Sequence, residues 1–224
     1  MCGRYTLALP LIEVAQALGI GLPTFDFSPR YNIAPTQRLP IITDEAPQQF
    51  HLHRWGLIPF WAKDPAIGNR MINARSETIA NKPAFRAAFR KRRCLIPATG
   101  FYEWKKTPTG KVPHHIYNQD SAVLTFAGLW ESWQDAEAKE IRSYTIITCP
   151  PNALMAPIHD RMPAIILPED RGRWLDPGLA PEAALALLQP YPPGLLQADP
   201  VSTQVNSPRN DGPQLLDPPP PTLF

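Results

Sequence analysis

The chain begins Met-Cys-Gly, and Cys2 is the residue whose position offers the most distinctive chemistry. If Met1 is removed, Cys2 carries a thiol and a free α-amine on one carbon. Their reference pKa values are about 8.5 and about 8, so both groups are partly nucleophilic near neutral pH. The amine can form a Schiff base with an aldehyde, and the thiol can then close a five-membered thiazolidine. Because this closure is intramolecular, we expect a long-lived adduct.

Two further residues have the character of general acids or bases. Glu103 lies among aromatic residues in the segment GFYEW, where poor solvation is expected to raise its pKa. His159 lies in PIHDRMP, a proline-stiffened loop that would hold the imidazole in place for proton transfer. The alternatives are a glutamate on an exposed strand face and a structural histidine.

Several segments have residue types suited to nucleic acid. Asn73 and Arg75 are two residues apart in INARSET, so an extended backbone places them on one side. Asparagine can bind a sugar hydroxyl or an amine, and arginine can bind a phosphate. Cations also lie beside aromatic rings at Arg4, at Trp61 and in the helix-like segment 82–93. This pattern is typical of single-stranded nucleic-acid binding, although solvated arginines and core tryptophans produce the same letters.

The composition indicates a soluble globular protein in a reducing compartment. The chain has 224 residues, 44% of them hydrophobic, and a net charge of +2, which by itself argues neither for nor against nucleic acid. Three cysteines fit no zinc spacing, and we expect Cys94 and Cys149 to be buried packing residues. No apolar stretch has the length of a signal peptide or a membrane span. We therefore expect a cytoplasmic protein without a metal, a cofactor or a membrane segment.

The element pattern predicts an α+β fold dominated by short strands. The chain has 29 prolines spread along its length, which excludes long helices from most of it. Helices are expected at 10–19, 82–92 and 181–189, and an extended polyproline-like end from about Asp211. Strands are expected in the runs rich in β-branched and aromatic residues, which are 4–9, 39–43, 49–58, 94–104, 114–118, 122–130, 143–149 and 162–167.

The ordered segments of the chain resemble one known family. These segments are MCGRYT, RYNIAPTQ, WGLIPFWAKD, INARSET, CLIPATGFYEW, FAGLWE, IHDRMP and VSTQVNSPRNDGP. Together they closely resemble the SOS response-associated peptidase (SRAP) family, whose members shield abasic sites in single-stranded DNA. The resemblance implies a barrel-like β core with a few flanking helices. It also implies one domain over residues 1–216, followed by a proline-rich tail, 217–224.

The resemblance implies roles for individual residues. Cys2 matches the residue that forms a thiazolidine with the ring-opened deoxyribose of an abasic site. Asn73, Glu103 and His159 match the family's other chemical positions, and this sequence departs from the pattern at none of them. The DNA contacts implied are Arg4, Asn32, Pro35, Trp61, Arg75, Thr148 and Arg161. The expected partner is single-stranded DNA containing abasic sites, bound by a monomer at the bacterial nucleoid.

Other functions fit parts of the same pattern. An amidohydrolase with an N-terminal cysteine nucleophile also begins Met-Cys-Gly. A cysteine peptidase that removes its own Met1 would use cysteine, histidine and asparagine. A third alternative is a protein that binds single-stranded DNA without covalent chemistry, with salt-sensitive affinity that is indifferent to base loss.

Overall fold

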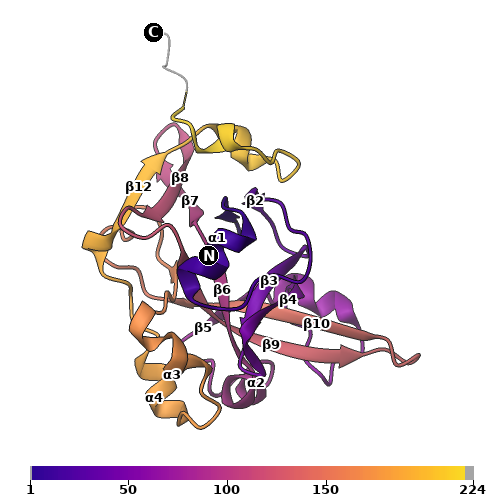
Figure 1. Ribbon diagram of the computed structural model, residues 1–224. Coiled ribbons are helices and arrows are strands. Elements are labelled where there is room, and N and C mark those ends of the chain that lie inside the picture. Colours follow the sequence, from indigo (N-terminus) through magenta and orange to yellow (C-terminus); the bar gives the residue numbers. More distant parts are fainter. Residues whose placement is uncertain (1, 220–224) are drawn as a thin grey trace.

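Five strands form a closed barrel in the computed structural model, which describes residues 2–219 (Figure 1). They are β3 (Arg38–Thr43), β4 (Ala46–Trp55), β6 (Arg93–Ala98), β9 (Leu124–Gln134) and β10 (Glu140–Cys149). The order is β10-β4-β3-β6-β9, and the ring closes because β9 also pairs with β10. The β4–β10 pair is parallel, and the other pairs are antiparallel. The predicted strand-rich α+β fold with a barrel-like core is confirmed.

A second, five-stranded sheet lies beside the barrel in the order β12-β8-β7-β1-β2. Its strands are β1 (Tyr5–Leu7), β2 (Arg30–Ile33), β7 (Gly100–Thr107), β8 (Gly110–Asn118) and β12 (Leu196–Pro200). β1 pairs with β7 so that Tyr5 lies opposite Phe101, and the Tyr102 amide donates to the Arg4 carbonyl at 3.0 Å. This register brings the residues before β1 alongside Glu103.

The segment 94–104, predicted as one strand, is divided between the two sheets. β6 ends at Ala98 in the barrel, and β7 begins at Gly100 in the second sheet. A side chain at Gly100 would lie 2.3 Å from the His115 ring, so glycine is required by this close approach. The change of sheet therefore depends on a tertiary contact that the strand pattern does not contain.

Two short strands attach to the end of β10. β5 (Asn73–Arg75) runs parallel to it, with Asn73 opposite Ile146 and Arg75 opposite Thr148. β11 (Met162–Pro163) runs antiparallel to it and pairs with Thr148 and Cys149. The INARSET and IHDRMP segments are therefore neighbours across one strand end.

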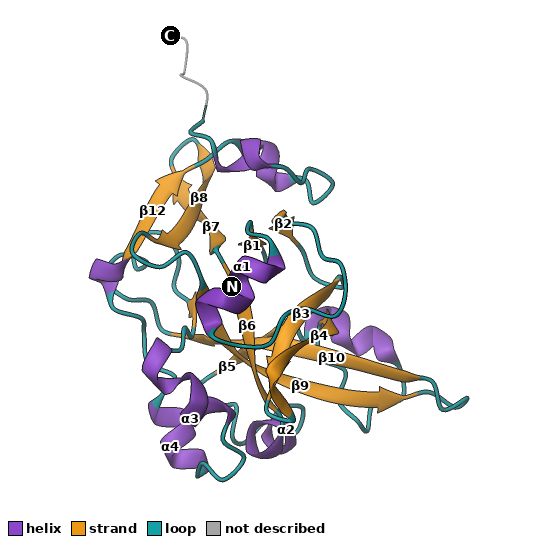
Figure 2. Cartoon of the chain, in the orientation of Figure 1, coloured by secondary structure: helices purple, strands orange, loops and turns teal. Residues whose placement is uncertain are grey.

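The helices lie outside the strands (Figure 2). α1 (Leu11–Leu18) ends at Gly19, whose φ of +67° is the left-handed conformation that glycine adopts without strain. α2 (Arg86–Lys91) and α4 (Pro181–Ala186) confirm the other two predicted helices, although both are shorter than expected. α3 (Arg171–Leu175) was not predicted. The short 3₁₀ helices are η1 (Pro65–Arg70), η2 (Pro168–Asp170), η3 (Pro193–Leu195), η4 (Thr203–Asn206) and η5 (Pro213–Leu216).

Aromatic side chains fill the barrel. The Trp55 ring contacts Tyr5 edge-on with centroids 5.2 Å apart, and it stacks on Tyr144 at 6.4 Å. The hydroxyl oxygens of Tyr5 and Tyr144 are 2.9 Å apart, so each buried phenol has a hydrogen-bond partner. Cys94 and Cys149 are buried free thiols, as the sequence predicts.

The segment that begins at Asp211 is packed, so the prediction of an extended end from this residue is wrong. The Asp211 carboxylate accepts from the Tyr31 amide at 2.6 Å and pairs with Arg30. Leu215 in η5 is completely buried. The segment is folded because its charged and apolar side chains find partners on β2 and β7. Of the predicted tail 217–224, residues 220–224 lie outside the described part of the chain.

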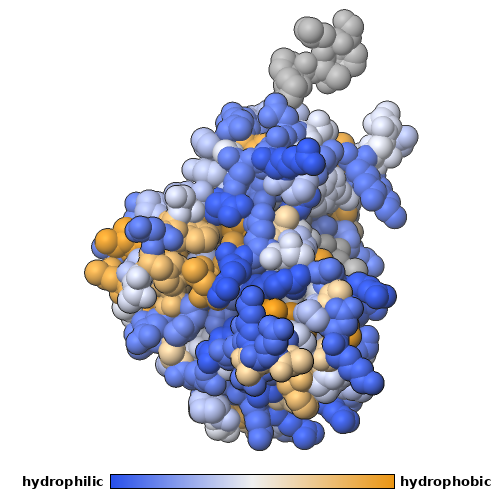
Figure 3. Space-filling view, turned by 90° about the vertical axis from the view of Figure 1, so that its right-hand side faces the viewer, coloured by the Kyte–Doolittle hydropathy of each residue, from blue (hydrophilic) through white to orange (hydrophobic). Residues whose placement is uncertain are grey.

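The surface is polar over most of the side shown in Figure 3, and apolar residues gather at the left edge of that view. No helix in residues 2–219 has the length and apolarity needed to cross a membrane.

Candidate functional site

Cys2 lies in the interior, where β5 and β7 approach the start of the chain. It has no solvent exposure, and the Asn73 side-chain amide donates to its carbonyl at 2.9 Å. The other end of that amide, Asn73 Oδ1, is buried without a hydrogen-bond partner among the described residues. Burial, followed by the charge of Glu103, raises the pKa of the Cys2 thiol well above its usual range. The thiol is therefore protonated at neutral pH and needs a base to become a nucleophile.

Glu103 is a buried carboxyl group beside Cys2. It lies on β7, its side chain is 3% exposed, and burial raises its pKa to about 7. The expectation of a poorly solvated glutamate with a raised pKa is therefore confirmed. At neutral pH both of its protonation states are populated, so it can either accept or donate a proton.

His159 faces Glu103 from the loop before β11. Its Nε2 is 3.8 Å from Glu103 Oε2. The Arg161 amide donates to Nδ1 at 3.0 Å, and an Asp160 carboxylate oxygen lies 3.0 Å from the same nitrogen. Burial lowers the pKa of His159, while the nearby Asp160 carboxylate opposes that effect. A carboxyl group and an imidazole are thus close enough to share proton-transfer steps.

Arg161 and Thr148 form the wall of the site at the end of β10. The Arg161 guanidinium donates to the Thr148 carbonyl at 2.6 Å and pairs with both carboxylate oxygens of Glu77. These bonds lower the pKa of Glu77. Arg75, opposite Thr148 in the β5–β10 register, is exposed. Arg75 therefore offers its charge to solvent, whereas Arg161 is held in place by internal partners.

Arg4 and Asn32 form a second cluster, which holds the C-terminal loop onto the sheet. Arg4 donates to the Asn32 side-chain oxygen at 2.8 Å and to the Val205 carbonyl at 2.9 Å. The buried Asn32 amide donates to the carbonyls of Val205, Ser207 and Asn210 at 3.2, 3.0 and 2.9 Å. Asn32 therefore fixes the course of residues 205–210, and Arg4 extends from β1 to the same loop.

The remaining two residues predicted to touch DNA, Pro35 and Trp61, lie on turns outside the strands. Pro35 is half-buried in the turn after β2, and Trp61 is 48% exposed between β4 and η1. The structure thus brings Cys2, Asn73, Glu103 and His159 together. Their roles, and those of the DNA-contact residues, stay predictions.

Two residues near the site were missed by sequence reasoning. Glu77 is the partner of Arg161 and lies two residues after Arg75 in INARSET. It is the acidic residue of that motif, so attention to the charged residues of INARSET would have identified it. Asn206 accepts from the Trp104 indole at 2.8 Å and joins the C-terminal loop to β7. This pairing has no local sequence signal because the two residues are about a hundred positions apart.

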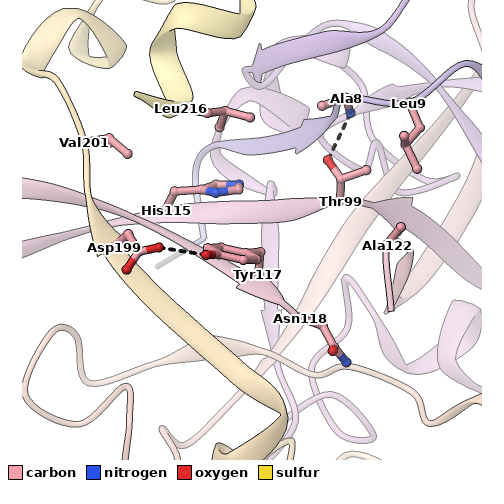
Figure 4. Close-up of a pocket in the computed structure, with 10 residues that line it drawn as sticks. All are labelled: Ala8, Leu9, Thr99, His115, Tyr117, Asn118, Ala122, Asp199, Val201 and Leu216. Carbon is pink, nitrogen blue, oxygen red and sulfur yellow. Dashed lines mark hydrogen bonds between the residues drawn. The ribbon is translucent and has the colours of Figure 1, made fainter. Parts of the chain in front are cut away.

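A separate cavity of about 380 Å³ lies on the other side of the second sheet (Figure 4). Tyr117 donates to Asp199 at 2.8 Å, and Thr99 accepts from the Ala8 amide at 3.0 Å. Tyr102, whose ring is 5.1 Å from that of His115 in this cavity's wall, precedes Glu103 on β7. Because side chains alternate along a strand, Glu103 points to the opposite face. The described residues hold no group of three or more His, Cys, Asp or Glu that could bind a metal.

Comparison with known proteins defines the class to which this fold and site belong. The family model described as "SOS response associated peptidase (SRAP)" matches residues 1–208. The chain is 45% identical over 222 residues to the abasic site processing protein YoqW of Bacillus subtilis, covering 97% of this chain and 99% of YoqW. It is 34% identical over 262 residues to the abasic site processing protein HMCES of Xenopus tropicalis, covering 96% of this chain and 78% of that protein.

A solved structure has the same fold. A crystal structure of a protein from Bacteroides thetaiotaomicron superposes with a TM-score of 0.89 at 29% identity, covering 97% of this chain and 99% of the other. The chain belongs to the SRAP family.

Proposed function

We propose that this protein senses and shields abasic sites in single-stranded DNA by forming a covalent thiazolidine between Cys2 and the ring-opened deoxyribose. The main support is the meeting of Cys2, Asn73, Glu103 and His159 from four distant segments in one buried site. The names of the relatives YoqW and HMCES, both abasic site processing proteins, support the same substrate.

The reaction begins with removal of Met1, because the Cys2 nitrogen is not nucleophilic while it is part of a peptide bond. An aminopeptidase or the site's own groups perform this cleavage, which would explain the word peptidase in the family description. Asn73 then orients the residue, since its Nδ2 already bonds the Cys2 carbonyl. Its Oδ1, which lacks a partner among residues 2–219, is available to accept from the freed amine.

Two bonds form at C1′ of the deoxyribose. The Cys2 amine adds to the aldehyde carbon, and the resulting carbinolamine loses water to give a Schiff base. The Cys2 thiol then adds to the same carbon, its proton ending on the nitrogen, and closes the ring. Glu103 and His159 carry the protons, because a carboxyl group with a pKa of about 7 can both supply and take a proton at neutral pH.

The DNA strand follows the cations and rings around this site. Arg75 contacts a phosphate, and Trp61 and Pro35 separate neighbouring bases. The loops that border the strand are positioned by Arg4, Asn32 and the pair Thr148–Arg161. Hydrogen bonds within the protein support this role. The protein acts as a monomer in the cytoplasm, on the DNA of the nucleoid.

The test is incubation with a single-stranded oligonucleotide that contains one abasic site. Processed protein should give a band that survives boiling in detergent, and Cys2→Ala should not. Cys149→Ser, which alters a thiol without an α-amine, should keep the band. An absent band with Met1-free protein would refute the proposal, and glutamine hydrolysis under the same conditions would favour the amidohydrolase alternative.

A further inference from the structure

A groove next to Trp61 carries an exposed aromatic ring and two exposed cations. It has a volume of about 440 Å³ and is lined by Phe60, Ala87, Arg90, Lys91, Arg92, Glu131 and Ser132. One wall is the loop before η1, and the other is the C-terminal half of α2. The basic segment 82–93 thus faces the turn that carries Trp61.

A buried carboxylate joins the two walls. Glu131 on β9 has 2% exposure and pairs with Arg92 at 2.5 Å, and the Phe60 backbone is among the groups that oppose the rise in the pKa of this carboxyl group caused by burial. The charge of Arg92 is therefore balanced inside the protein. The Phe60 ring is 58% exposed.

The remaining charges of the groove point outward. Arg90 and Lys91 are exposed in the last turn of α2, and within residues 2–219 neither has an acidic partner within ion-pair distance. One contribution of such residues is to complement the helix dipole. That role does not require an exposed phenylalanine beside them. An apolar ring next to two exposed cations matches the chemistry of a base and its phosphates.

We propose that Phe60, Arg90 and Lys91 extend the DNA-binding surface beyond Trp61 and hold the single strand at nucleotides distant from the abasic residue. Phe60 stacks on a base, and the two cations neutralise phosphates. The occupant is DNA because the surface continues from the adjacent Trp61 and is complementary in charge to a phosphate backbone. This inference rests on the proposed function for the path of the strand.

Non-covalent binding tests the groove separately from the covalent chemistry. The measurement is fluorescence anisotropy with single strands that have all their bases. One strand has about 20 nucleotides, which is longer than the usual binding site of a single-strand-binding fold, and the other has about 4, which is the lower limit of such sites. The variants are Phe60→Ser and the double variant Arg90→Gln/Lys91→Gln. The double variant Lys111→Gln/Lys139→Gln is the control, since it removes the same charge from exposed positions elsewhere.

For the long strand we expect Phe60→Ser to weaken binding about tenfold, the effect of removing one stacked base. The Arg90/Lys91 variant should lower the slope of log affinity against log salt by about 1.4, or ~0.7 for each phosphate that the variant leaves without a cation. The short strand should bind all variants equally. Equal binding of the long strand by the Arg90/Lys91 variant and its control would overturn the inference.

Two controls separate a loss of folding from a loss of DNA binding, and the groove from the covalent chemistry. Each variant is first checked by circular dichroism, and Phe60→Leu, which keeps an apolar side chain without an aromatic face, replaces Phe60→Ser if that protein unfolds; it should still bind the long strand more weakly. If abasic DNA gives no covalent band but the long strand depends on the groove, the proposed chemistry fails and the groove stands. If the band forms and the variants bind like the control, the groove is refuted and the chemistry stands.

Discussion

Replacing Glu103 with glutamine should change how the stability of the protein depends on pH. Burial raises the pKa of this carboxyl group from 4.5 to about 7. Between those values the folded chain keeps a proton that the unfolded chain has released, so the free energy of unfolding falls as pH rises through this window. At about 1.4 kcal/mol per pH unit, the decrease between pH 5 and pH 8 is roughly 2–3 kcal/mol.

Glutamine has nearly the same shape and carries no charge, so Glu103→Gln removes this decrease. Urea unfolding at pH 5 and pH 8 measures it as the difference between the variant and the unaltered protein. We expect the variant to gain roughly 2–3 kcal/mol relative to the unaltered protein on going from pH 5 to pH 8. The control is Glu182→Gln, on the first turn of α4 away from the site, which should show no such gain.

The same variant should form the DNA adduct more slowly, because a proton-transfer group is removed while the fold is retained. If neutralising Glu103 makes the protein more stable and the reaction slower, Glu103 is a buried charge that is kept for function. If the relative stability of Glu103→Gln is the same at pH 5 and pH 8, Glu103 is not held as a perturbed carboxyl group and the reasoning is refuted.

Three other substitutions test the structure around the site. Asn73→Ala should slow adduct formation about 10- to 100-fold, because Cys2 loses its orienting bond; quenched time courses measure this, and an unchanged rate would count against the role. Asn32→Ala should cost about 2–3 kcal/mol, since it removes the buried side-chain amide whose two hydrogens are shared among three loop carbonyls, and should speed hydrogen exchange in residues 205–210; unchanged exchange there would contradict its role. Arg161→Gln should raise the pKa of Glu77 toward its usual value in an NMR titration, and a constant value would show that Arg161 is not the cause.

Much of the fold could be predicted because the strands carry their own local signal. The β-branched runs at β9 and β10 and the Pro10–Gly19 boundaries of α1 are independent of the rest of the chain. The division at Thr99, by contrast, depends on the close approach of His115 to Gly100. The packing of Asp211 and Leu216 depends on partners near residue 30 and on β7, which no local pattern contains.

The candidate site was predictable as a set of residues but not as an arrangement. The raised pKa of Glu103 was predicted from its aromatic neighbours in the sequence, but its cause is burial against other segments, because side chains alternate along β7 and Tyr102 lies on the opposite face. The 3.8 Å approach of Glu103 to His159 requires β7 and the loop before β11 to meet in space. Asn32 shows the same limit, because no local pattern indicates that its amide donates to carbonyls of the C-terminal loop.

The most direct test of the central claim is the intact mass of Met1-free protein after exposure to abasic single-stranded DNA. The account predicts a product whose mass is the sum of protein and oligonucleotide less one water molecule. The product should resist dilution, and Cys2→Ser, which keeps the amine but not the sulfur, should lose it on dilution. If Cys2→Ser gives an adduct of equal persistence, with a mass equal to that variant plus oligonucleotide less one water molecule, the closure of a ring through the thiol is contradicted.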